Sequence, residues 1–206
     1  MNHGVIEAAL RAEQAAPPLV RALRVFAVAL TAFTPLLVFD VVTRTDGPLA
    51  VLVLALLGVV VLPLYVRVGI LWLRWFHPLY EAVADADRAR MPYGGMWFWA
   101  WVIPIVSLFL PKLLVNDVWR ATDPLGDRST PSAPVQRWWA SWVAVGFVSA
   151  LADLWFPFML LNVPLLVVSA VLAVGAVEAL TERVHVLRVL AAEPAMVRAT
   201  EQGVAP

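Results

Sequence analysis

The sequence predicts an all-α, polytopic membrane protein. Of its 206 residues, 62% are hydrophobic and only 15% are charged, and the mean hydropathy is +0.81. Soluble domains contain about 45–50% apolar and about 25% charged residues. Apolar runs near the length of about 18 residues that marks a membrane helix recur along the chain. These observations predict one helical membrane domain over residues 20–190, between a polar N-terminal tail (1–19) and a frayed C-terminal tail (191–206).

Four transmembrane helices are expected, with prolines at several of their boundaries. Pro17 and Pro18 are expected to end any helix in the tail, Pro78 to end the second helix and Pro164 to belong to a turn, because proline lacks an amide donor and clashes with the preceding turn. The expected helices cover residues 20–42, 49–66 with an extension to 75, 137–155 and 165–179.

The stretch Trp97–Val115 begins as a membrane segment but is unlike a full span. It contains Pro104 and Pro111 and reaches Lys112 after about 15 residues, whereas a span needs about 20. If this stretch crossed the bilayer, the basic residues would divide almost evenly between the two sides. If it enters and leaves on one side, every Lys and Arg except Arg44 lies on the cytoplasmic side, as the positive-inside rule requires. We therefore expect four transmembrane helices, a proline-broken re-entrant or interfacial segment, and cytoplasmic termini.

Part of this stretch resembles the signature of a multi-pass membrane protein family that is common in actinobacteria and is catalogued as a domain of unknown function. The pattern is W-x-x-P-I-x-N/S-L-x-x-P followed by an acidic-apolar-Trp element ending in Ser or Thr. The matching residues are Trp101, Pro104, Ser107, Pro111, Asp117, Trp119, Arg120 and Thr122.

Weaker likenesses are the Trp138-Trp139-x-x-Trp142 run and the pair Leu180-Thr181. The chain departs from the family at Ser107, where Asn is usual, and at Val184, where Gln is usual. The family's basic element with Asn, which follows the second helix, is replaced here by Arg74-Trp75-Phe76-His77. The resemblance implies a multi-pass architecture in a bacterial cytoplasmic membrane and implies no activity.

Four ionisable residues are expected at membrane depth, where charge is costly. Asp40 and Asp153 belong to the outer ends of the first and third helices, and form a candidate outward-facing cation or proton site. Arg67 and Glu178 belong to the inner ends of the second and fourth helices and are a candidate ion pair. The alternative is that all four reach interfacial water.

Two further features have alternative interpretations. The break between Pro104 and Pro111, with Ser107 inside it, either exposes carbonyl groups to a solute or only seats the segment against the bundle. Trp119 and Arg120 either dock a cytoplasmic protein or anchor the chain to anionic headgroups.

Composition argues against several functional classes. The net charge is zero, so nucleic acid is not an expected partner. The chain has no cysteine and only three histidines, which lie far apart in sequence, so a metal site is not expected. Hydrolase, zinc-protease and phosphate-loop motifs are absent from the sequence, so no cofactor is expected.

The expected function is that of a non-enzymatic accessory, scaffold or sensor subunit with a Trp/Arg-rich cytoplasmic face. Its expected partners are the lipid bilayer and either another protein or further copies of itself. The alternative is a small oligomeric ion or solute transporter or channel that uses the broken segment and the helix-end carboxylates.

Overall fold

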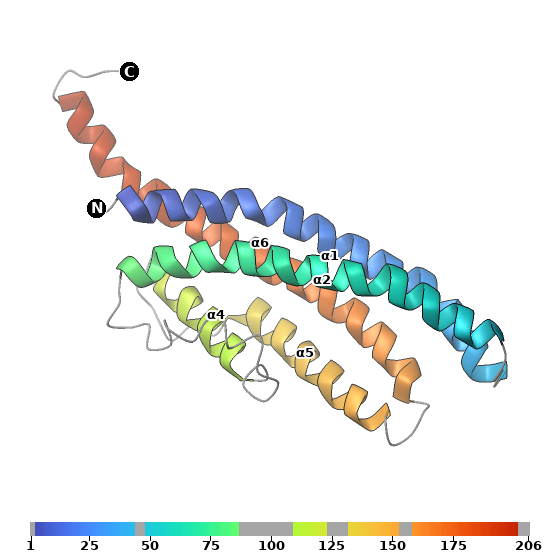
Figure 1. Cartoon of the computed structure of the whole chain (residues 1–206). Helices are drawn as coiled ribbons and strands as arrows, with labels where there is room; N and C mark the ends of the chain where they lie inside the picture. Colours follow the sequence, from blue (N-terminus) through green and yellow to red (C-terminus); the bar gives the residue numbers. More distant parts are fainter. Residues whose placement is uncertain (1–2, 44–47, 87–108, 123–131, 153–157, 202–206) are drawn as a thin grey trace. The chain divides into compact units, whose positions relative to one another are not determined.

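The computed structural model describes residues 3–43, 48–86, 109–122, 132–152 and 158–201. Within these ranges the regular secondary structure is entirely α-helical (Figure 1), which confirms the all-α class. The helices are α1 (His3–Thr43), α2 (Pro48–Ala86), α4 (Leu110–Ala121), α5 (Ala133–Ala152) and α6 (Phe158–Glu201).

Three of these helices are long and apolar enough to cross a membrane. The candidate spans are Gly4–Pro35 in α1, Gly58–Val83 in α2 and Leu160–Val186 in α6. The membrane-protein class is therefore supported by the described residues. α5 is not among the three, so the fourth predicted span stays a prediction. The first part of the predicted re-entrant segment, residues 97–108, lies outside the described residues.

The chain divides into two compact units, and α1, α2 and α6 each contribute to both. Residues 17–73 and 133–177 form one, which we call the four-helix unit because it takes segments from α1, α2, α5 and α6. Residues 1–16, 74–132 and 178–206 form the other, which we call the α4 unit.

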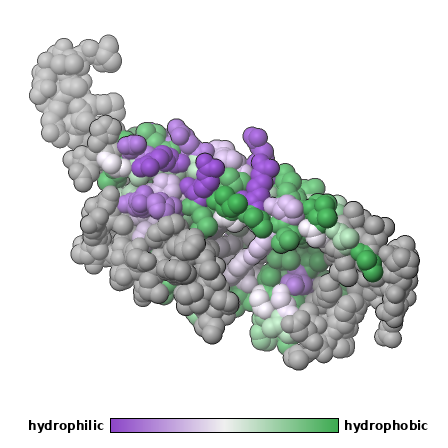
Figure 2. Space-filling view, in the orientation of Figure 1, coloured by the Kyte–Doolittle hydropathy of each residue, from purple (hydrophilic) through white to green (hydrophobic). Residues whose placement is uncertain are grey.

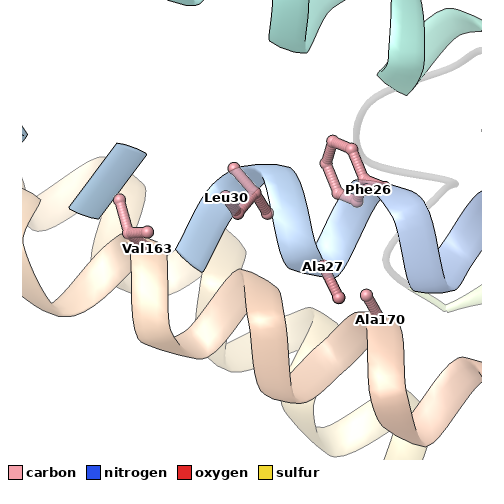
Figure 3. Packing of buried hydrophobic residues seen from close by; sticks show 5 residues of the cluster. All are labelled: Phe26, Ala27, Leu30, Val163 and Ala170. Atoms are coloured by element: carbon pink, nitrogen blue, oxygen red, sulfur yellow. The ribbon is translucent and has the colours of Figure 1, made fainter. Parts of the chain in front are cut away.

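The core of the four-helix unit brings α1, α2 and α6 together. Phe26, Ala27 and Leu30 of α1 form a buried cluster with Val163 and Ala170 of α6 (Figure 3). Three half-exposed residues of α2 and two of α6 pack around it: Val61, Leu64, Val68, Leu166 and Val167. The small side chains of Ala27 and Ala170 face each other in Figure 3, which allows the two helices to approach closely.

α5 joins this unit through an aromatic stack and a hydrogen bond. The rings of Trp72 on α2 and Trp138 on α5 stack with their centroids 4.9 Å apart. At the other end of α5, the side-chain amide of Asn162 on α6 donates to the hydroxyl of Ser149 at 2.8 Å. These contacts connect α5 to both neighbouring helices.

Large hydrophobic side chains are exposed on the four-helix unit, and Figure 2 shows hydrophobic surface on the face that it draws. Large apolar patches are rare on water-soluble surfaces, whereas lipid tails are as apolar as these side chains. This surface therefore fits a lipid environment. The exposed residues in this unit include Val25, Val28, Val59, Leu62, Val66, Ile70, Phe147, Leu161, Val168 and Val171.

The α4 unit has an apolar core that contains fully buried aromatic residues. Trp75, Phe76 and Leu79 of α2 are fully buried, as are Leu114 and Val118 of α4. The contributions of α1 and α6 are smaller side chains: Ala8, Ala12, Leu180 and Val184. A core of this kind holds α4 in a defined place.

Three expected proline boundaries are wrong. α1 continues through Pro17 and Pro18, α2 continues through Pro78, and α6 already includes Pro164. Each proline costs a helix about 3 kcal/mol, but packing of the neighbouring turns outweighs this cost. Ala16 and Leu19 flank the first pair and are buried, and Pro78 is buried beside Leu79.

Helix boundaries shift as a result. Residues 3–16 of the predicted polar tail are the first turns of α1, and α2 continues to Ala86, beyond its expected extension to residue 75. α5 begins at Ala133 rather than at Arg137, and α6 continues beyond Pro194 to Glu201. The ends of apolar runs therefore underestimate these helices.

Candidate interaction site around α4

Helix α4 holds four of the predicted site residues and has one buried and one exposed side. Pro111 lies in its first turn, where a missing amide hydrogen costs no hydrogen bond, and is buried with Leu110 and Leu114. Asp117 and Trp119 are half-buried, and Arg120 is exposed. The predicted site residues Trp101, Pro104 and Ser107 lie outside the described residues.

Thr122 ends α4 by binding its last carbonyl groups. Its hydroxyl donates to the carbonyl oxygens of Val118 at 2.9 Å and Trp119 at 3.1 Å. Its backbone amide also donates to Val118, at 3.0 Å. Carbonyls at a helix end have no partner within the helix, so Thr122 is a C-terminal cap. This role gives a physical reason for a Ser or Thr at the end of the Asp117–Thr122 element.

Trp119 contacts α6 through a cation–π interaction. The guanidinium carbon of Arg183 lies 4.1 Å from the centroid of the Trp119 ring. Such contacts contribute about 0.5–2 kcal/mol, and more when water is excluded. Arg183 was not among the predicted site residues, and its position in the charged part of the last helix gave no sign of this pairing.

Thr181, two residues before Arg183 on α6, contacts α2. Its hydroxyl accepts a hydrogen bond from the indole nitrogen of Trp75 at 3.2 Å. Trp75 is fully buried, so this bond satisfies a donor that water does not reach. The Leu180-Thr181 likeness therefore marks a position that fixes two helices of the α4 unit to each other.

Asp117 faces the α2 side of the same unit. Its carboxylate interacts electrostatically with the hydroxyl of Tyr80 on α2, which is buried. Neither Asp117 Oδ2 nor the Tyr80 hydroxyl has a hydrogen-bond partner among the residues that the structure describes. Burial raises the pKa of the Asp117 carboxyl above its usual range, and the nearby Arg120 charge opposes part of this rise.

Replacing Asp117 by Asn should raise stability at neutral pH. A carboxyl whose pKa is higher in the folded state stabilises the fold when protonated, below its unfolded pKa of 3.8, and this stabilisation is lost as the pH rises through the folded pKa. The melting temperature of Asp117→Asn should therefore exceed that of the parent protein at pH 7–8, and the difference should shrink toward pH 4. Glu182→Gln, which removes an exposed carboxylate of the same unit, is the matched control. A difference that is independent of pH would contradict this account of Asp117.

The contacts of α4 described above lie within a region that matches a known protein family. The model of the family described as Domain of unknown function (DUF4328) matches residues 40–192. The chain belongs to this family. The family region includes Trp75, all of α4, Thr181 and Arg183, so the contacts of α4 are contacts within the DUF4328 domain. No curated protein and no solved structure is detectably similar to the chain.

One more polar contact joins the DUF4328 region to residues that precede it. Arg188 on α6 donates to both carboxylate oxygens of Glu13 on α1, from Nε at 2.9 Å and from Nη2 at 3.0 Å. His185 Nδ1 lies 3.4 Å from the same carboxylate. A bidentate arginine–carboxylate pair is among the stronger polar contacts in proteins. It connects the beginning of α1 to the DUF4328 domain.

The Glu13–Arg188 pair should contribute measurably to stability. A double-mutant cycle with Glu13→Gln and Arg188→Met should give a coupling of about 1–2 kcal/mol, because the pair is bidentate and mostly buried. The His77–Glu81 pair on α2 is the matched control, since its side chains are 38% and 49% exposed. Its coupling should be about 0–0.5 kcal/mol. Equal couplings for the two pairs would contradict this assignment.

The described part of the structure shows no site formed by the four predicted intramembrane residues. Arg67 in the four-helix unit and Glu178 in the α4 unit are both exposed. Asp40 belongs to α1, but its side chain lies outside the described part, as does all of Asp153. Their cation site and the Arg67–Glu178 pair therefore stay predictions. Within the described ranges, no group of three or more His, Asp or Glu side chains is placed to hold a metal ion.

Proposed function

We propose that the chain is a multi-pass protein of the bacterial cytoplasmic membrane, with four transmembrane helices and with the α4 unit and both termini in the cytoplasm. The distribution of arginine along the sequence supports this orientation. The grouping of four helical segments in one unit with an exposed apolar surface supports the number of spans.

We infer further that the protein is a non-enzymatic accessory, scaffold or sensor subunit. The observation that carries this proposal is the setting of Trp119 and Arg120: a buried apolar face fixes α4, Arg183 holds Trp119, and Arg120 is left exposed. Tryptophan and arginine on a rigid scaffold are the residues that contribute most to protein interfaces. This arrangement suits the recognition of another protein.

The orientation is tested by chemical labelling in intact cells. The chain has no cysteine of its own, so single cysteines at Thr130 and Val197 report one position each. Both should be shielded from a membrane-impermeant thiol reagent until the cells are opened. Labelling of position 130 from outside would overturn the proposed topology.

The role is tested by photo-crosslinking from position 121, next to Arg120, followed by mass spectrometry. A single partner should be captured, and Arg120→Glu should abolish its capture. Arg11→Glu, which reverses another exposed charge in the α4 unit, is the matched control and should leave capture intact. Purified protein in liposomes should conduct no ions. A flux that Asp40→Asn or Asp153→Asn abolishes would instead support the transporter alternative.

A further inference from the structure

The outward face of α4 combines exposed apolar and basic side chains. Phe109, just before the helix, is 61% exposed and Leu113 is 40% exposed. Arg120 is exposed, and Lys112 is half-exposed beside them. We call these four residues the outer stripe.

Helical geometry aligns the stripe on one side. With about 100° of rotation per residue, Phe109, Leu113 and Arg120 lie within a narrow sector. The opposite sector holds the buried Pro111, Leu114 and Val118. α4 thus carries apolar side chains on both sides, and those that are buried in its own unit lie on the inner side.

Two polar residues next to the stripe, Asn116 and Asp117, interact with other parts of the α4 unit. The side chain of Asn116 accepts a hydrogen bond from the Ser132 hydroxyl at 2.8 Å. Asp117 directs a buried carboxylate oxygen toward the interior, on the Tyr80 side. The cationic side chains of the stripe are those of Lys112, which is half-exposed, and Arg120, which is exposed.

We propose that the outer stripe binds the anionic surface of the lipid bilayer. Phe109 and Leu113 enter the boundary between headgroups and acyl chains, and Lys112 and Arg120 contact lipid phosphates. Apolar side chains flanked by cations are the composition of helices that lie in the membrane interface. The same chain contains candidate membrane spans, so α4 is expected to lie near a bilayer. The inference shares Arg120 with the proposed protein contact and goes beyond it at Phe109, Leu113 and Lys112, so labels at 109 and 113 test the lipid contact separately.

The test uses the full chain in nanodiscs. Because the sequence has no cysteine, an environment-sensitive fluorophore on Phe109→Cys or Leu113→Cys reports a single position. Glu182→Cys, at an exposed site on α6 in the same unit, is the control. Discs contain either phosphatidylcholine alone or phosphatidylcholine with phosphatidylglycerol, and quenchers are either a spin-labelled lipid or aqueous iodide.

In discs with phosphatidylglycerol, the labels at 109 and 113 should shift their emission to the blue, lose iodide quenching and gain quenching by the spin-labelled lipid. The label at 182 should stay accessible to iodide. Adding Lys112→Gln and Arg120→Gln should return the first two labels to the values seen in phosphatidylcholine alone.

Three outcomes would overturn the proposal. Iodide quenching of the labels at 109 and 113 that equals the quenching of the control label would place the stripe in water. Shielding from both quenchers would show that protein covers the stripe. Quenching by the spin-labelled lipid that is equal in both kinds of disc, and unaffected by removing the two cations, would exclude recognition of anionic headgroups. A matching elution volume in size-exclusion chromatography, with the label at 182 unchanged, shows that each variant is folded.

Discussion

Replacing Trp75 with alanine should lower the free energy of unfolding of the α4 unit by about 3–5 kcal/mol, the usual cost of deleting a large buried aromatic side chain. Trp75 has no exposed surface, and its ring lies against Phe76 with the centroids 6.2 Å apart. The change leaves a cavity between the aromatic residues of α2 and removes the donor to Thr181. Hydrogen exchange of the α4 amides, measured in detergent, should become much faster.

Two further variants separate packing from hydrogen bonding. Thr181→Val keeps the volume but leaves the buried Trp75 indole without its acceptor, and should cost about 1–3 kcal/mol. Val186→Ala, at an exposed position of α6, should cost little. Equal effects of Trp75→Ala and Val186→Ala would show that Trp75 is not part of a packed core.

Ala170→Phe should destabilise the four-helix unit by about 1–3 kcal/mol, the cost of overpacking a close contact. Ala170 is 5% exposed and faces Ala27 across the contact between α1 and α6 (Figure 3). Helix association in a membrane depends on such close approach, because lipid removes most of the hydrophobic driving force. The inserted ring has to push the two helices apart. Unfolding in mixed micelles of increasing sodium dodecyl sulfate measures the loss.

The neighbouring position provides the control. Val171 is 58% exposed, so the same ring introduced by Val171→Phe points into detergent or lipid and should change stability little. If Val171→Phe lowers stability as much as Ala170→Phe, the loss comes from the ring itself. The inference of a tight contact between α1 and α6 would then be wrong.

Hydropathy was enough to predict the helical class and the membrane character of this chain. The helix ends were misplaced because each proline was interpreted as a helix terminator. Pro17, Pro18 and Pro78 lie in helices whose neighbouring residues are buried, and the energy of that packing depends on residues that are distant in sequence. Local propensity contains no information about this tertiary contribution.

The candidate site was predictable only in part. A sequence pattern identified Asp117, Trp119 and Arg120, which share one helix. Their partners Tyr80 and Arg183 belong to other helices and carry no distinguishing local signal. The same is true of Glu13 and Arg188, which are separated by 175 positions. Pairings of this kind follow from the way helices pack, and a single sequence does not show them.

The Glu13–Arg188 pair has a practical consequence for protein production. Glu13 precedes the matched family region of residues 40–192, and so do Phe26, Ala27 and Leu30 of the four-helix core. A fragment cut at the family boundary would expose the α6 surface that these residues cover and leave Arg188 without its carboxylate partner. Such a fragment should aggregate or be degraded, whereas a version that begins near residue 3 should not. The boundaries of the family and those of the folding unit are therefore different, and expression trials should follow the second.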